Sequence, residues 1–128
     1  SLMIEQPASE SVRSKIIESR SYGLINCLEV GEYGQPLILV IHGSGPKNSA
    51  KTYEFFLYDY IARISFLERF YIIAIDCPGY GQSTGSKEAI KTFPRQLLEE
   101  ILEALHYNNY FILMGHSQGG AAIFNAVH

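Results

Sequence analysis

Three uninterrupted apolar runs constrain the fold of this chain more than any other feature. The runs are Leu37–Ile41, Tyr71–Ile75 and Tyr110–Met114, and they stop at a histidine, an aspartate and a glycine, respectively. Within each run no polar residue alternates with the apolar ones, so both faces of each strand have to be buried. This pattern is typical of the inner strands of a parallel sheet. It predicts covering layers on both faces of that sheet.

The segments between the runs are long enough to form the helices that connect parallel strands. Residues 52–67 and 93–105 both carry apolar side chains at helical spacing, and Thr92 is placed to cap the second helix. The first apolar stripe comprises Phe56, Tyr60, Ile64 and Leu67. The second comprises Phe93, Leu97, Leu98, Ile101, Leu102 and Leu105, with Glu99, Glu100 and Glu103 expected to face outward.

Two weaker strands, about Lys15–Ser19 and Leu24–Val30, precede the first run and can pair as a hairpin through Tyr22 and Gly23. The sequence therefore predicts one α/β domain, with a mostly parallel sheet and crossover helices. We expect this domain to cover residues 14–128. Residues 1–13 are rich in Ser and Glu, and we expect them to form a loose leader.

Composition narrows the class of partner and the compartment. The chain has 10 Lys and Arg residues against 13 Asp and Glu residues, a net charge of −3, and no basic run, which argues against nucleic acid as a partner. No apolar stretch approaches the roughly 20 residues of a membrane span. The first residues lack the pattern of a secretory signal, and Cys27 and Cys77 form no CxxC pair. These features favour a cytoplasmic protein with free thiols.

The glycine-rich segments do not have the spacing of a nucleotide-binding loop. Residues 43–49 lack the Gly-Lys-Ser/Thr end of a phosphate loop, and residues 79–85 place their third glycine one position too late for a dinucleotide fingerprint. The His, Cys, Asp and Glu residues show no metal-ligand spacing either. We therefore expect neither a cofactor nor a metal.

The string GHSQG at residues 115–119 follows the third apolar run and opens an Ala-rich helical stretch. This strand–turn–helix context can hold Ser117 at the tip of a strained turn, where Gly115 and Gly119 leave room for the neighbouring backbone. The N-terminus of the helix would then point its N–H groups at an anion forming near Ser117. The competing interpretation is a simple serine N-cap on a glycine-flanked helix.

Two further motifs follow the other two runs. They are HGSGP at residues 42–46 and DCPGYGQS at residues 76–83. With GHSQG, and in this order, they resemble the α/β-hydrolase fold superfamily, and the match runs from about residue 15 to residue 128. The string HGSGP also resembles the carbon–carbon bond hydrolases that act on ring-cleavage products, although those continue with a small residue where this chain has Lys47.

The resemblance implies a role for each site residue. Ser117 would be the nucleophile, and the backbone N–H groups of Gln118 and Ser44 would form the oxyanion hole. The supporting residues of these loops would be His42, Gly43, Gly115 and Gly119. In the same family pattern Asp76 is a turn-forming acceptor rather than a catalytic acid. A serine nucleophile implies a small-molecule ester, thioester, amide or ketone substrate, and it disfavours the dehalogenase and epoxide-hydrolase branches, which use aspartate.

The base and the acid of such an enzyme are missing from this sequence. Eleven residues follow Ser117, without a carboxylate and with His128 as their one histidine. At ~1.5 Å per residue, His128 would lie roughly 16 Å from Ser117 along the helix, far beyond hydrogen-bond reach. We therefore expect the N-terminal portion of an α/β hydrolase, truncated after the helix of the nucleophile elbow and inactive by itself.

The alternative is a short, non-catalytic relative that acts as a binding or interaction module. A downstream reading frame with an Asp or Glu followed by a His would favour the enzyme. In a truncated sheet the strand Tyr110–Met114 would have an exposed edge, which predicts self-association through that edge.

Overall fold

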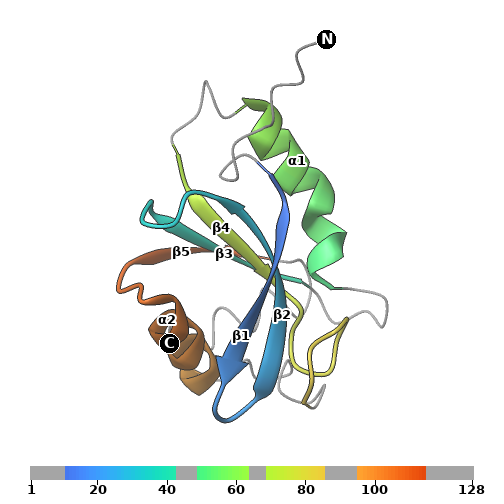
Figure 1. Cartoon of the computed structure of the whole chain (residues 1–128), viewed down its shortest axis with the longest axis vertical. Helices are drawn as coiled ribbons and strands as arrows, with labels where there is room; N and C mark the ends of the chain where they lie inside the picture. The colour runs from blue at the N-terminus through green and yellow to red at the C-terminus, as the bar shows by residue number, and fades with distance from the viewer. Residues whose placement is uncertain (1–10, 43–48, 64–68, 86–94, 115–128) are drawn as a thin grey trace.

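The computed structural model describes residues 11–42, 49–63, 69–85 and 95–114 (Figure 1). Its elements in chain order are β1 (Arg13–Ser19), β2 (Gly23–Gly31), β3 (Leu37–Ile41), the 3₁₀ turn η2 (Ala50–Tyr53), α1 (Glu54–Arg63), β4 (Tyr71–Ile75), α2 (Arg95–Leu105) and β5 (Tyr110–Met114). The three predicted apolar strands are confirmed with their bounds. The predicted hairpin is confirmed as well, as β1 and β2.

The strands form one sheet in the order β1-β2-β4-β3-β5. β2 pairs antiparallel with β1 and β4, whereas β3 pairs parallel with both β4 and β5. The predicted α/β sheet is therefore confirmed, but among the described strands it is mixed, with two parallel and two antiparallel pairings, rather than mostly parallel. Among the described strands β5 is the last on its side, which is the position that self-association requires. Self-association itself stays a prediction.

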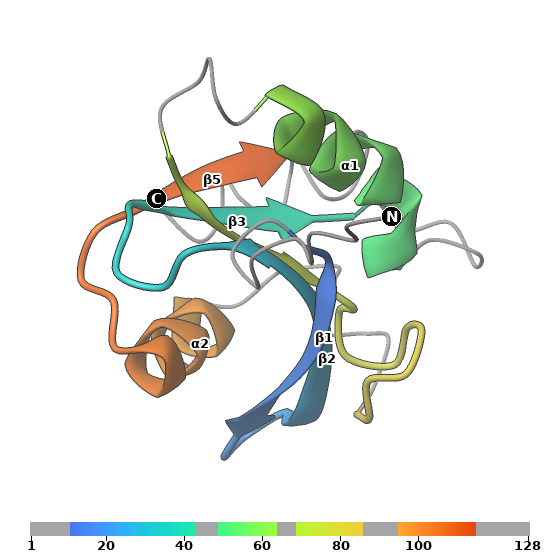
Figure 2. The same ribbon diagram turned by 45° about the horizontal axis from the view of Figure 1, so that its top comes forward.

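The two helices cover opposite faces of the sheet (Figure 2). Alternate residues of the central strands point to the two faces, as the continuous apolar runs require. The core on the α2 side includes Leu37, Leu39, Ile41, Tyr71, Ile73 and Ile75 from the strands, together with Leu97, Leu98, Ile101 and Leu105. The core on the α1 side includes Leu28, Val30, Val40, Ala50, Leu57, Ile72 and Ala74.

The parallel register brings the ends of three strands to one edge of the sheet. Ile41 lies opposite both Ile75 of β4 and Met114 of β5. The residues that follow these positions are His42, Asp76 and Gly115, the first residues of the three sequence motifs. We call this side the carboxyl edge of the sheet, and in open α/β sheets it is where ligands bind.

The first crossover helix differs from its sequence-based expectation. The 3₁₀ turn η2 precedes α1, which begins at Glu54 and is described to Arg63. Leu57, which the predicted stripe did not include, is fully buried, while the neighbouring Phe55 is 74% exposed. Residues 64–67, the end of the predicted helix, lie outside the described residues. So does Thr92, the predicted cap of α2.

The expectation that Glu100 faces outward is wrong, because its side chain is buried. Its carboxylate accepts hydrogen bonds from the Ser19 hydroxyl and the Ser21 backbone N–H, both at 2.8 Å. These bonds fasten α2 to the β1–β2 turn. Hydrogen bonds from Ser21 and Ser19 outweigh the burial of this carboxyl and lower its pKa from 4.5 to about 2.

Tyrosine side chains hold the opposite edge of the sheet, where β3 and β5 begin. The Tyr33 hydroxyl donates to the Leu105 carbonyl at 2.6 Å, and the Tyr107 hydroxyl donates to the Gln35 carbonyl at 2.8 Å. The rings of Tyr33 and Tyr107 meet edge to face, with their centroids 5.3 Å apart. The loop before β3 and the loop before β5 are thereby joined.

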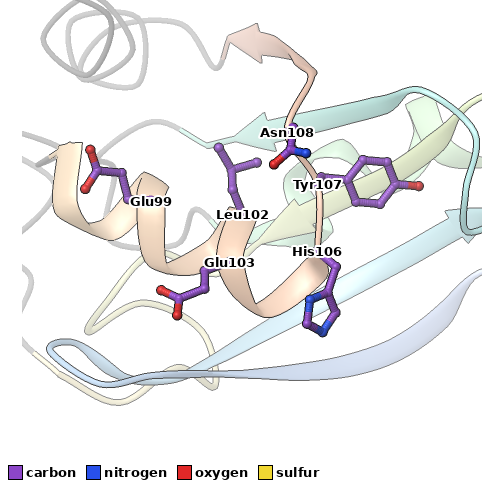
Figure 3. A pocket seen from close by; sticks show the side chains of 6 residues that line it. All are labelled: Glu99, Leu102, Glu103, His106, Tyr107 and Asn108. Atoms are coloured by element: carbon purple, nitrogen blue, oxygen red, sulfur yellow. The ribbon is translucent and has the colours of Figure 1, made fainter.

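The C-terminus of α2, which Figure 3 shows from close by, ends in a Schellman motif. The N–H of Tyr107 donates to the carbonyl of Leu102, and the N–H of His106 donates to the carbonyl of Glu103. His106 occupies the left-handed position, with a φ of 58°. Glycine is preferred there because a Cβ costs roughly 1 kcal/mol or more in this conformation.

The depressed pKa of Glu100 predicts a pH-dependent contribution to stability. The contribution is fully present above the ordinary pKa of 4.5 and is lost as the pH falls through about 2. We expect the free energy of unfolding of Glu100→Gln to fall less between pH 5 and pH 2 than that of the unmodified protein. Urea titrations at several pH values measure this fall. Glu99→Gln, at an exposed neighbouring position, should match the unmodified protein, and identical pH profiles for all three proteins would contradict the prediction.

The backbone conformation of His106 predicts that the position prefers glycine. His106→Gly should be more stable than His106→Ala by about 1 kcal/mol, because alanine keeps the left-handed strain that glycine removes. The comparison requires the midpoints and slopes of urea unfolding for both variants. Equal stability would show that the position does not hold this conformation in solution.

Candidate active site

Only part of the sequence-predicted site lies among the described residues. His42 and Asp76 are described, at the carboxyl edge of the sheet. The other predicted site residues lie outside the described residues: Gly43, Ser44, Gly115, Ser117, Gln118 and Gly119. The structure therefore defines the strand ends and the chain segments that flank the site.

Asp76 follows β4 and is the most highly connected side chain of this edge. It is 3% exposed. Its Oδ1 accepts a hydrogen bond from the Ala50 N–H at 2.7 Å, and its Oδ2 accepts from the Gln82 N–H at 2.9 Å and from Asn26 Nδ2 at 3.0 Å. The bond from Gln82 confirms the predicted turn-forming role. The bonds from Ala50 and Asn26 connect the same carboxylate to two distant segments.

The DCPGYGQS motif forms a turn that is fastened to β2. The N–H of Asp76 donates to the Asn26 carbonyl at 2.8 Å, and the N–H of Asn26 donates to Ser83 Oγ, also at 2.8 Å. Ser83 Oγ in turn donates to the Asp76 carbonyl at 2.5 Å. The serine that ends the motif therefore closes the turn.

Gly81 is required in this turn because the Asp76 carboxylate lies against its backbone. Its φ is +52°, and a Cβ at this position would lie 2.3 Å from Asp76 Oδ2 and 2.4 Å from Asp76 Cγ. Such distances are shorter than any non-bonded contact, so a side chain at this position would displace the carboxylate.

His42 is fully buried at the end of β3. Its Nε2 accepts a hydrogen bond from the Cys77 N–H at 3.0 Å, so the ring proton has to be on Nδ1. The ring meets Tyr80, with the two centroids 5.0 Å apart. Because the lone pair of Nε2 is already used, His42 could take a proton from a serine only by breaking this bond. The geometry favours a structural role.

The cysteines of this region are not activated nucleophiles. Burial is the main cause that raises the pKa of the Cys77 thiol to about 12, and the negative charge of Asp76 adds to it. Burial likewise raises the pKa of Cys27 well above its usual range. Both thiols are free, as predicted, and both are protonated at neutral pH.

Two of the hollows on the described surface lie at different ends of the sheet. One of about 220 Å³ adjoins Asp76 and is lined by Ser14, Asn26, Leu28, Ser49, Ala50, Lys51, Gly81 and Gln82. The other, of about 460 Å³, lies at the C-terminus of α2, where Glu99, Glu103 and His106 surround it (Figure 3). The second of these hollows is therefore at the end of the sheet opposite to the sequence motifs.

The described residues contain no group of three or more His, Cys, Asp and Glu side chains that could hold a metal ion. Among the helices that the structure describes, none is both long and apolar enough to cross a membrane.

A family model described as the alpha/beta hydrolase fold matches residues 36–128, a stretch that begins just before β3 and includes all three motifs. The chain belongs to the α/β hydrolase fold family. The resemblance drawn from the motifs is thereby confirmed, and so is the α/β fold class.

Solved structures of α/β hydrolases show the same fold. The chain is similar to epoxide hydrolase A from Mycobacterium thermoresistibile, with a TM-score of 0.71 and 22% identity over 91% of this chain and 34% of that one. It is similar to the 2-hydroxy-6-oxo-6-phenylhexa-2,4-dienoate hydrolase from a Rhodococcus species, with a TM-score of 0.72 and 21% identity over 91% of this chain and 41% of that one. For naproxen esterase from Bacillus subtilis the TM-score is 0.68 and the identity 23%, over 91% of this chain and 38% of that one. The chain spans well under half the length of each of these α/β hydrolases.

Sequence reasoning missed the partners that bind Asp76. Asn26 and Ala50 lie 50 and 26 positions away along the chain, and nothing in their local sequence marks them. One local signal was present near Ala50. Ser49 and Thr52 have capping-box spacing, and the structure shows that box at the start of η2.

The contact between Gly81 and Asp76 predicts that Gly81→Ala is strongly destabilising, by about 3 kcal/mol, because it adds left-handed strain and displaces a buried carboxylate. Gly34→Ala is the matched control, since Gly34 also has a positive φ but a Cβ there would meet nothing within 4 Å. We expect Gly34→Ala to cost only about 1 kcal/mol. Urea unfolding measures both values, and equal costs would show that the carboxylate does not lie against Gly81.

Proposed function

We propose that this chain carries the nucleophile and the oxyanion hole of a serine hydrolase, with Ser117 as the nucleophile. The observation that supports the proposal is the register of the three parallel strands. β5 ends level with β3 and β4 at the carboxyl edge, and the GHSQG string follows the last residue of β5 in the sequence. A nucleophile elbow needs this position on the sheet.

In the proposed reaction Ser117 Oγ attacks the carbonyl carbon of the substrate. A base takes the hydroxyl proton, and the carbonyl oxygen becomes an oxyanion. The bond from the carbonyl carbon to the leaving group then breaks, and the leaving group takes the proton. Water attacks the resulting acyl-enzyme in the same way, which releases a carboxylic acid and restores Ser117.

The oxyanion is the charge that the site has to stabilise. We assign this task to the backbone N–H groups of Gln118 and Ser44, one after the elbow and one in the loop after β3. His42, Gly43, Gly115 and Gly119 support these two loops. The engaged Nε2 of His42 agrees with a supporting role.

The proposal requires a histidine base and an orienting acid, and neither described histidine offers that base. His42 is engaged with Cys77, and His106 is at the other edge of the sheet, after α2. The chain covers 34% to 41% of the three α/β hydrolases compared above. We therefore assign the acid and the base to sequence that follows Ser117 in the complete protein.

For the substrate we propose a small molecule with an ester, thioester, amide or cleavable ketone group. The esterase and the dienoate hydrolase among the similar structures agree with this range of carbonyl chemistry. The epoxide hydrolases share the fold, but a serine at the nucleophile position favours acyl transfer over epoxide opening.

The proposed function predicts that Ser117→Ala abolishes hydrolysis in the complete protein encoded by the gene. We expect a fluorophosphonate probe to label the complete protein once per chain and to leave Ser117→Ala unlabelled, at an unchanged unfolding midpoint. The 128-residue chain alone should stay unlabelled, because Ser117 lacks its base there. Labelling that persists in Ser117→Ala would contradict the assignment of the nucleophile. A complete protein without any labelling would favour a non-catalytic binding module instead.

A further inference from the structure

We propose that Asp76 is a positioning residue for the oxyanion hole, because it and its neighbour Cys77 hold both ends of the loop that follows β3. The inference rests on the proposed function. It goes beyond the turn-forming role of Asp76, since it assigns to this carboxylate an effect on the rate of the chemical step.

The first end of the loop is held through His42. This residue ends the described chain after β3, and the Cys77 N–H donates to its Nε2 at 3.0 Å. Both groups are fully buried, so water does not compete for the bond. The N-terminal end of the loop is therefore fastened to the first turn after β4.

The second end is held through Ala50. After the six residues 43–48, the described chain resumes at Ser49, and the N–H of Ala50 donates to Asp76 Oδ1 at 2.7 Å. Ala50 is 2% exposed. The capping box supports this end from the other side, because the Ser49 N–H donates to Thr52 Oγ1 at 3.0 Å.

Both ends of the loop are thus attached to two consecutive residues, Asp76 and Cys77. Asp76 can accept the Ala50 N–H only while its carboxylate keeps this position. Hydrogen bonds from Asn26 and Gln82 hold the carboxylate, and Gly81 leaves room for it. An oxyanion-hole donor has to lie 2.7–3.1 Å from the oxyanion, so small shifts of the loop lower the rate. The residues that hold Asp76 therefore act on catalysis through the loop.

Asp76→Asn tests the inference in the complete protein. A carboxylate offers two acceptor oxygens to its three N–H donors, whereas an amide offers one oxygen and an opposing NH₂ group. At least one bond to a backbone N–H is then lost. With p-nitrophenyl butyrate we expect kcat to fall about 10- to 100-fold while KM stays within about twofold.

A tetrahedral-adduct inhibitor separates positioning from a general loss of folded enzyme. An alkyl trifluoromethyl ketone forms an oxyanion on Ser117, so its inhibition constant should rise by the same factor as kcat falls. A smaller fraction of correctly folded protein would lower the apparent kcat and leave that constant unchanged. Fluorophosphonate titration supplies the concentration of active sites for both measurements.

Two further variants complete the test. Thr52→Val removes the acceptor of the Ser49 N–H at a half-exposed position, so it keeps the proposal testable if Asp76→Asn does not fold. We expect it to show the same pattern with a loss of about threefold. Asp59→Asn is the control, because it removes one exposed carboxylate from α1 and should leave all constants unchanged.

An unchanged inhibition constant in Asp76→Asn, or in Thr52→Val if only that variant folds, would overturn the inference and leave the proposed function intact. Loss of substrate affinity with an unchanged kcat would also overturn it. Absence of Ser117 labelling in the unmodified complete protein would overturn the proposed function, and the positioning role with it.

Discussion

The buried carboxylate of Asp76 is the interaction on which the carboxyl edge of this sheet depends. Three N–H donors from β2, from the start of η2 and from its own turn meet on its two oxygens. A carboxylate at 3% exposure is unfavourable without such donors, and with them it specifies one arrangement of the segments around it. The glycine at position 81 and the serine at position 83 follow from the same requirement, because one leaves room for the carboxylate and the other closes the turn. The DCPGYGQS motif is therefore a structural unit that joins its own turn to β2 and to the start of η2.

The fold could be predicted from the sequence because its strongest signal is also its strongest physical requirement. A run such as Tyr71–Ile75 has no polar position to place in water, so it has to be an inner strand with a layer on each face. The same reasoning placed β3 and β5, and the motifs after them defined the family. The hairpin was predictable from the turn at Gly23. Helix bounds were less certain, since α1 is preceded by a 3₁₀ turn that is fixed by the Ser49 and Thr52 caps rather than by an apolar stripe.

The side-chain bonds between distant segments could not be predicted in the same way. Glu100 has the local pattern of a solvent-facing helix residue, and it is buried because the β1–β2 turn presents a hydroxyl and an N–H to it. The tautomer of His42 depends on Cys77, which is 35 positions away. The sequence identified His42 and Asp76 as residues of the site region. Only the tertiary arrangement shows which donors they face, and therefore which chemistry they are free to perform.

Three backbone N–H groups at this edge of the sheet are bound by side-chain acceptors. These are the N–H groups of Ala50 and Gln82, which donate to Asp76, and that of Cys77, which donates to His42. Residue-resolved hydrogen exchange of the complete protein measures their protection directly. We expect all three amides to exchange as slowly as the amides of β4. Exchange of the Ala50 and Cys77 amides at the rate of unprotected backbone would contradict this expectation.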